Sequence, residues 1–168
     1  MRDGVLPVAK PAGPTSHDIV ARARRALGRR RIGHLGTLDP AAEGLLVLVV
    51  GRATRLARYA AGWRKTYEGI IRLGTTTDTD DRTGRVVASS DAWRSLGADA
   101  VRAAVARFRG GYEQQPPAFS AVKIAGERAY RRARRGQAVA PPPRRVEIAE
   151  LEVPAVEPPD VRFRAVVG

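Results

Sequence analysis

The sequence of 168 residues contains no cysteine. This absence excludes disulfide bonds, catalysis by a thiolate and metal sites with cysteine ligands. The longest uninterrupted apolar run, residues 45–50, is far shorter than the roughly 20 residues that a membrane-spanning helix needs. Internal repeats and low-complexity segments are absent as well. We therefore expect a soluble, cytoplasmic protein that does not bind membranes.

Acidic residues are scarce relative to basic ones. Seventeen Asp and Glu residues stand against thirty Lys and Arg residues, which gives a formal net charge of +13. Such an excess predicts a polyanionic partner, because each neutralised phosphate releases counterions. A solvated basic surface without a ligand would have the same composition. The arginines within residues 22–31 lead directly into the loop described next, so they are our main candidates for phosphate contact.

Residues 33–40 read Gly-His-Leu-Gly-Thr-Leu-Asp-Pro, and the rest of the chain is organised around this stretch. Glycine adopts backbone angles that other residues avoid, and Pro40 restricts the backbone directly after Asp39. Such a loop can hold the carboxylate of Asp39 in one pose. The apolar run at residues 45–50 predicts a following strand that is buried on both faces. A turn whose aspartate only caps the next segment is the alternative for this motif on its own.

The sequence pattern favours an α+β fold with a mixed, mostly antiparallel sheet and flanking helices, because strands outnumber helices and no βαβ rhythm repeats. One helix should begin after Thr15 or Ser16 and end at Gly28. The other expected helices are residues 52–61, with Leu56 and Ala60 on the inner face, residues 101–108 and the basic residues 128–135. The expected strands are residues 5–8, 45–50, 65–73, 85–88, 112–124 with a Pro-Pro interruption, 146–153 and 161–165.

Three aspartates lie in the polar loop at residues 75–84 and raise the question of a cation site. Their spacing lacks the glycine and the terminal glutamate of an EF-hand, so we expect no metal there.

Several further motifs occur in a fixed order. They are Lys-Pro-Ala-Gly at residues 10–13, Thr-Ser at 15–16, Gly-Leu-Leu at 44–46, Gly-Arg-Ala-Thr-Arg at 51–55, Lys-Thr-Tyr at 65–67, Gln-x-Pro at 115–117 and Ser-Ala-x-Lys at 120–123, followed by Gly126 and Tyr130. Together with residues 33–40 they resemble the TruB-type tRNA pseudouridine synthases over nearly the whole chain. Ala9, Glu43 and Phe119 depart from the residues that are common in that family.

The resemblance implies the pseudouridine synthase fold and an isomerase that converts uridine 55 in the T loop of tRNA into pseudouridine, without cofactor or metal. It makes Asp39 the nucleophile, a role that a carboxylate can fill. Tyr67 would stack on the flipped target base and could take part in proton transfer, although packing in the core is the alternative for this residue. The implied substrate-binding residues are His34, Lys10, Arg52, Lys123 and Tyr130. His34 could instead hydrogen-bond within its own loop, and Lys10 and Arg52 could be structural.

Residues 161–165 alternate like a strand, yet the sequence stops at Gly168. In the resembled family a Gly-Thr-Tyr-Ile-Arg block follows, with the arginine that pairs with the nucleophilic aspartate, and usually a PUA domain. We therefore expect residues 1–168 to be a truncated pseudouridine synthase catalytic domain, monomeric and inactive or nearly so on its own. The alternatives are a guide-dependent relative that modifies ribosomal RNA and a non-catalytic RNA-binding module.

Overall fold

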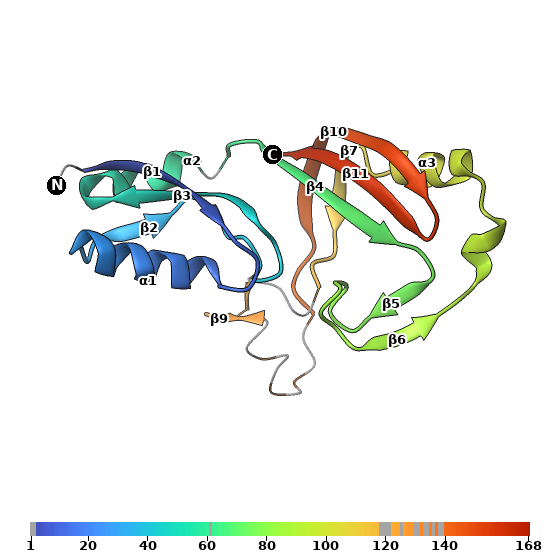
Figure 1. The fold of residues 1–168 in the computed structure, drawn as a ribbon, viewed down its shortest axis with the longest axis horizontal. Helices are drawn as coiled ribbons and strands as arrows, with labels where there is room; N and C mark the ends of the chain where they lie inside the picture. The colour runs from blue at the N-terminus through green and yellow to red at the C-terminus, as the bar shows by residue number, and fades with distance from the viewer. Residues whose placement is uncertain are drawn as a thin grey trace. The chain divides into compact units, whose positions relative to one another are not determined.

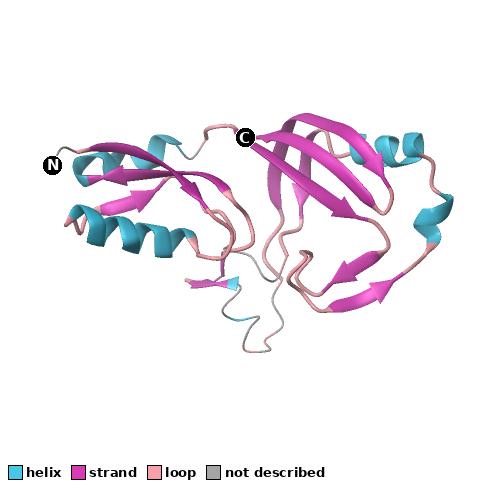
Figure 2. Cartoon of the chain, in the orientation of Figure 1, coloured by secondary structure: helices cyan, strands magenta, loops and turns pink. Residues whose placement is uncertain are grey.

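The computed structural model describes residues 3–60, 62–117, 122–124, 126–129, 132, 135, 137 and 140–168. The chain forms two compact units, Met1–Trp63 and Arg64–Gly168. Figures 1 and 2 show the helices and strands of each unit.

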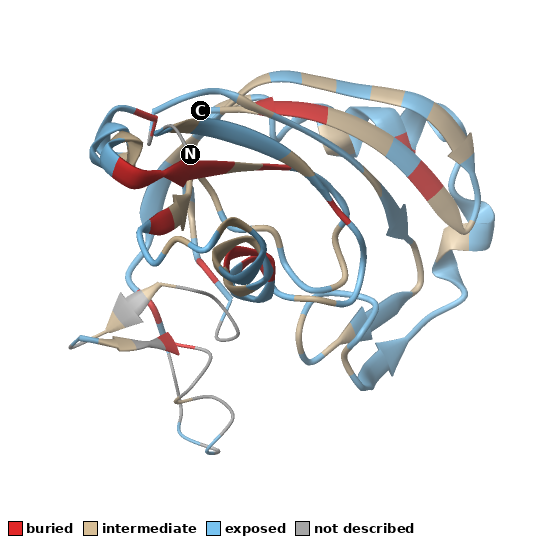
Figure 3. Cartoon of the chain, turned by 60° about the vertical axis from the view of Figure 1, so that its left-hand side comes forward, coloured by how far each residue is buried: buried red, intermediate tan, exposed pale blue. Residues whose placement is uncertain are grey.

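The first unit is a three-stranded antiparallel sheet with one long helix against it (Figure 1). Its elements are β1 (Gly4–Lys10), α1 (Ser16–Leu27), β2 (Ile32–His34), β3 (Gly44–Val50), the 3-10 helix η1 (Gly51–Leu56) and the short helix α2 (Ala57–Ala60). The strand order is β1-β3-β2, so β3 is the central strand. Ile19 and Val20 of α1 pack with Ile32, Leu46, Leu48 and Val50 to form the core. The buried positions therefore follow β3 and one side of α1 (Figure 3).

Both ends of α1 are capped as the sequence predicts. Thr15 is the N-cap, and its hydroxyl oxygen accepts a hydrogen bond from the backbone N–H of Asp18 at 3.1 Å. The carboxylate of Asp18 accepts in return from the backbone N–H of Thr15 at 2.8 Å, which completes a capping box. At the other end Gly28 adopts a left-handed conformation with a φ of 60°. These local contacts set where α1 begins and ends.

The second unit is built on a four-stranded antiparallel sheet with the order β4-β11-β10-β7. Two small antiparallel pairs, β5-β6 and β8-β9, accompany it, and α3 packs against β10. The elements are β4 (Lys65–Arg72), β5 (Thr75–Thr77), β6 (Val86–Ser89), the 3-10 helix η2 (Ala92–Ser95), α3 (Ala98–Ala106), β7 (Gly110–Gln114), β8 (Lys123–Ile124), β9 (Glu127–Arg128), β10 (Arg144–Glu157) and β11 (Asp160–Val167).

The expected α+β architecture is confirmed, and every strand pair in the described part of the chain is antiparallel. Two local expectations are wrong. Leu45 is 68% exposed, so only the second half of β3 is buried on both faces. Leu56 is 51% exposed and lies at the end of a 3-10 helix instead of on the inner face of an α-helix. Arg128 ends the strand β9, but Ala129 and Arg132 within the helix expected over residues 128–135 are helical, and residues 130, 131, 133 and 134 lie outside the described residues.

No helix in the described part of the chain is both long enough and apolar enough to cross a membrane.

Candidate active site

The loop between β2 and β3, residues 35–43, carries Asp39 and is called the Asp39 loop below. Strand pairing fixes both of its ends, because His34 is opposite Leu48 and Gly44 is opposite Lys10 of β1. The backbone N–H of Leu35 also donates to the carbonyl of Val47 at 2.9 Å. The loop therefore starts and ends on the sheet of the first unit.

Lys10 holds the part of this loop that follows Asp39. Its side chain is 1% exposed, and the ammonium donates to the carbonyl oxygens of Ala42 at 2.6 Å, Pro11 at 3.0 Å and Pro40 at 3.4 Å. A buried ammonium is costly unless such acceptors surround it. We infer that Lys10 shapes the loop, since direct contact with substrate would require its ammonium to leave all three carbonyls.

Ser16, the first residue of α1, holds the backbone next to Asp39. Its hydroxyl accepts a hydrogen bond from the N–H of Leu38 and donates one to the carbonyl of Leu38, both at 2.9 Å. The N–H of Gly13 donates to the carbonyl of Pro40 at 2.7 Å. The residues on both sides of Asp39 are thus tied to the segment that leads into α1. The sequence suggested Ser16 only as a helix cap, and nothing in its local pattern points to Leu38.

The carboxylate of Asp39 itself is exposed and has no hydrogen-bond or ion-pair partner among the described residues. Among the described residues, Asp39 takes part in one hydrogen bond: its backbone carbonyl accepts from the N–H of Ala42 at 3.1 Å. The loop is therefore held by its backbone and by neighbouring side chains, while the acid remains available to a ligand.

The other expected site residues of the first unit flank the two strands that carry the loop. His34 ends β2 and is half-buried, and its Nδ1 atom is buried without a hydrogen-bond partner in the described structure. Arg52 is exposed in the first turn of η1, directly after β3. The first unit thus brings Lys10, His34 and Asp39 to one loop and places Arg52 at the end of the neighbouring strand.

The remaining expected site residues belong to the second unit. Tyr67 lies on β4 opposite Ala165 and is 40% exposed in this structure. Lys123 lies on β8, paired with Arg128 of β9. Tyr130 lies outside the described residues. No group of three or more His, Asp or Glu residues in the described ranges is placed to hold a metal ion.

The model of the TruB family pseudouridylate synthase N-terminal domain matches residues 24–168. The chain belongs to the TruB family. This chain is 52% identical to a tRNA pseudouridine synthase B of Symbiobacterium thermophilum over 151 residues, which are 90% of this chain and 50% of that protein. Identity to the enzyme of the same name from Thermobifida fusca is 49% over 166 residues, 97% of this chain and 56% of that protein. This TruB-family chain spans about half the length of the curated relatives it matches.

Solved structures show a similar fold. The fold is similar to a crystal structure of a Cbf5-Nop10-Gar1 complex, with a TM-score of 0.68 and 28% identity over 98% of this chain and 39% of that one. It is also similar to an H/ACA RNP bound to a substrate RNA containing 2'-deoxyuridine, with a TM-score of 0.66 and 24% identity over 98% of this chain and 37% of that one. The pseudouridine synthase fold expected from the sequence is therefore confirmed.

Proposed function

We propose that this chain carries the nucleophile of a tRNA pseudouridine synthase that isomerises uridine 55 in the T loop of tRNA. The observation that carries this proposal is the Asp39 loop, whose backbone is bonded at Leu38, Pro40 and Ala42, while the Asp39 carboxylate is exposed and has no partner among the described residues. Membership in the TruB family supports the reaction class, and the curated relatives named tRNA pseudouridine synthase B support tRNA as the substrate.

The reaction breaks the bond between the base and the ribose, turns the base and rejoins it through carbon. A carboxylate can act as the nucleophile in such a rearrangement and requires neither metal nor cofactor. The uridine must first leave its stack, which costs a few kcal/mol. A loop that is already held in place loses little further freedom when the base arrives, so Asp39 can meet the nucleotide in a prepared pose.

Other residues complete the proposed site. Tyr67 stacks on the flipped base and takes part in proton transfer, and His34 lies against neighbouring bases. Arg52, Lys123 and Tyr130 bind the RNA, while Lys10 acts through the loop. We also propose that residues 1–168 belong to one catalytic domain, which works as a monomer in the cytoplasm on the T arm of tRNA.

A guide-dependent enzyme is the second candidate. Two of the structural neighbours are complexes of Cbf5 with further proteins, and another is an H/ACA RNP bound to a substrate RNA. The higher identity to stand-alone tRNA enzymes favours the first candidate. The two differ in a simple assay, since only the guide-dependent enzyme would require a second RNA for specific modification.

The experiment that tests the proposed function measures pseudouridine formation in a tRNA transcript. Two proteins are compared: the 168-residue chain, and the same chain joined to the C-terminal half of the Symbiobacterium relative. We expect turnover only by the joined protein, because the arginine and tyrosine of the Gly-Thr-Tyr-Ile-Arg block are not in this sequence. Robust turnover by the 168 residues alone would contradict the expected inactivity of this chain.

The substitution Asp39→Asn in the joined protein identifies the nucleophile. We expect a loss of activity by a factor of about 10³ or more with tRNA affinity changed less than about twofold, because the amide keeps the shape but is a poor nucleophile. Loss of binding together with activity would make Asp39 a structural residue. A change in neither would remove Asp39 from the mechanism.

A further inference from the structure

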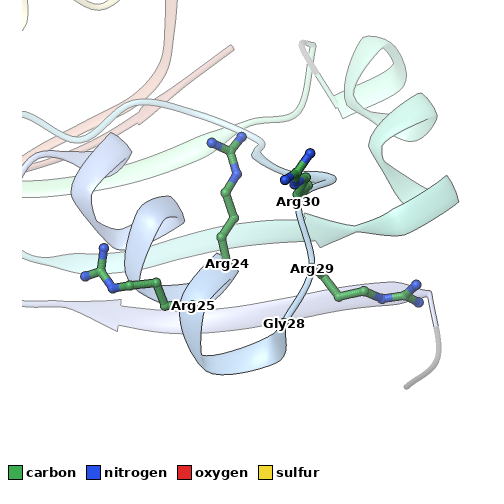
Figure 4. Close-up of a pocket in the computed structure, with 5 residues that line it drawn as sticks. All are labelled: Arg24, Arg25, Gly28, Arg29 and Arg30. Carbon is green, nitrogen blue, oxygen red and sulfur yellow. The ribbon is translucent and has the colours of Figure 1, made fainter.

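An open recess of about 520 Å³ lies at the C-terminal end of α1. It is lined by Arg24 and Arg25 of the last helical turn, by the cap residue Gly28, and by Arg29 and Arg30 on the way to β2 (Figure 4). These residues are called the arginine recess below. The guanidinium groups of Arg24 and Arg30 extend to the same side, and those of Arg25 and Arg29 extend to opposite sides (Figure 4). The recess thus presents cations over a broad surface.

Among the described residues, few acidic groups pair with these arginines. Asp3 is the one described carboxylate that pairs with the recess, at 3.2 Å from Nη2 of Arg29. Arg24 donates from Nη2 to the carbonyl of Ile32 at 2.9 Å, and its Nε is buried without a partner in the described structure. Arg25 and Arg30 form no ion pair with any described residue. Concentrated charge of one sign raises the local concentration of counter-ions.

The helix dipole does not account for the whole cluster. Cations near a helix C-terminus are favoured only within the last turn, which covers Arg24 and Arg25 but not Arg29 and Arg30. Two of the last four helix carbonyls are also occupied, because the N–H of Gly28 donates to the carbonyl of Arg25 and that of Arg29 to the carbonyl of Arg24, at 3.3 and 3.1 Å. The recess is therefore suited to an external anion.

The position of the recess indicates which part of an RNA it would meet. The Asp39 loop is bonded to Ser16 at the first residue of α1, and the arginine recess surrounds the last turn of the same helix. The helix has 12 residues, and with a rise of 1.5 Å each its ends are about 18 Å apart. That distance corresponds to several steps along a nucleic-acid strand.

We propose that the arginine recess binds the phosphodiester backbone of the double-helical stem of the substrate RNA, several base pairs from the nucleotide that enters the Asp39 loop. This assignment rests on the proposed function for the identity of the RNA. Arginine suits the task, because its planar group donates two parallel hydrogen bonds to a phosphate. The recess positions the stem, and the Asp39 loop receives the loop of the RNA.

The test measures RNA binding by the 168-residue chain at several salt concentrations. Arg25→Gln combined with Arg30→Gln removes two cations that form no ion pair with a described residue. Arg107→Gln combined with Arg109→Gln, both exposed, is a control with equal charge loss. The RNAs are a T-arm stem-loop with a full stem and the same loop closed by a shortened stem. For the full stem we expect the recess variant to lose affinity roughly tenfold or more and the salt slope to fall by about 2.

For the shortened stem the recess variant should bind like the unmodified chain. If the recess variant loses equal affinity for both stems, the assignment to the stem is overturned. If it loses no more affinity than the control variant, the loss comes from net charge alone and the recess is not a binding site. An equal loss with a DNA hairpin of the same sequence would make the recess a general phosphate site. Failure of the unmodified chain to prefer the T arm over an unrelated stem-loop would count against the proposed function and leave the recess test intact.

Discussion

Two loops of this protein each place an aspartate at a turn, but they use the carboxylate in opposite ways. In the first unit the Asp39 loop is bonded through Lys10 and Ser16, and the Asp39 carboxylate has no described partner. In the loop between β5 and β6, Oδ1 of Asp81 accepts from the hydroxyl of Thr83 at 2.6 Å, from its N–H at 2.8 Å and from the hydroxyl of Thr79 at 2.8 Å.

Asp81 stabilises its own loop through its carboxylate, whereas the Asp39 loop is stabilised by other residues and leaves the Asp39 carboxylate exposed. The donors to Asp81 come from within two residues, whereas the groups that hold the Asp39 loop come from 22 to 32 residues away. A carboxylate that accepts three bonds from its own turn has less capacity left for a ligand. A carboxylate that others support retains that capacity, which is why Asp39 and not Asp81 is the candidate nucleophile.

The largest expected effect is on stability and comes from Lys10→Met. The substitution keeps most of the apolar stem but leaves the carbonyls of Pro11, Pro40 and Ala42 without their shared donor. We expect the free energy of unfolding of the first unit to fall by about 3 kcal/mol. Urea titration followed through the amide signals of β3 measures it. Arg55→Met, at an exposed position, should change it by less than about 0.5 kcal/mol, and an equally small effect of Lys10→Met would refute the anchoring role.

A smaller effect is expected from Ser16→Ala. The change removes both hydrogen bonds to Leu38, and we expect a loss of about 1–2 kcal/mol with faster hydrogen exchange of the Leu38 amide. Thr15→Ala is the matched control, since it removes the N-cap of the same helix while Ser16 stays. If Thr15→Ala accelerates exchange at Leu38 as much as Ser16→Ala does, the effect comes from the helix and not from the hydroxyl of Ser16.

The two aspartates can be compared directly by replacing each with alanine. Asp81→Ala should cost about 1 kcal/mol in the second unit, because three donors lose their acceptor at an exposed site. Asp39→Ala should change stability by less than about 0.5 kcal/mol. Thermal unfolding of both variants measures these two losses of stability. A larger loss for Asp39→Ala would reverse the roles that the contacts assign.

The smallest effect concerns pH. Hydrogen bonds from Thr83 lower the pKa of Asp81, and those from Thr15 lower the pKa of Asp18, relative to the ordinary value of 3.8. A lowered pKa means that the folded state binds protons less readily, so this contribution is present above about pH 4 and is lost as pH falls through the lowered values. The unmodified chain should therefore lose stability below pH 4 more steeply than Asp81→Asn combined with Asp18→Asn. If the stability of the two proteins falls with pH at the same rate, the two pKa shifts are contradicted.

The sequence predicted most elements of the fold and the candidate nucleophile, but it failed where burial depends on a distant partner. Leu45 was expected inside because it belongs to an apolar run, and Leu56 because it was placed on the inner face of an expected helix, yet both are exposed in the described structure. Tyr67 was left open between core and site, and in this structure it is exposed on the edge strand β4. The site role of Tyr67 stays a prediction.

By itself the sequence determined the limits of α1 and the family motifs around Asp39. Thr15, Asp18 and Gly28 act within one turn of chain, so their bonds form wherever the helix forms. Only the tertiary structure decided that Lys10 and Ser16 would hold the Asp39 loop. Pairing of β1 with β3 brings Lys10 opposite Gly44, and packing of α1 on the sheet brings Ser16 to Leu38. Such bonds join residues far apart in sequence, and the folding of the whole unit is what places them within reach of each other.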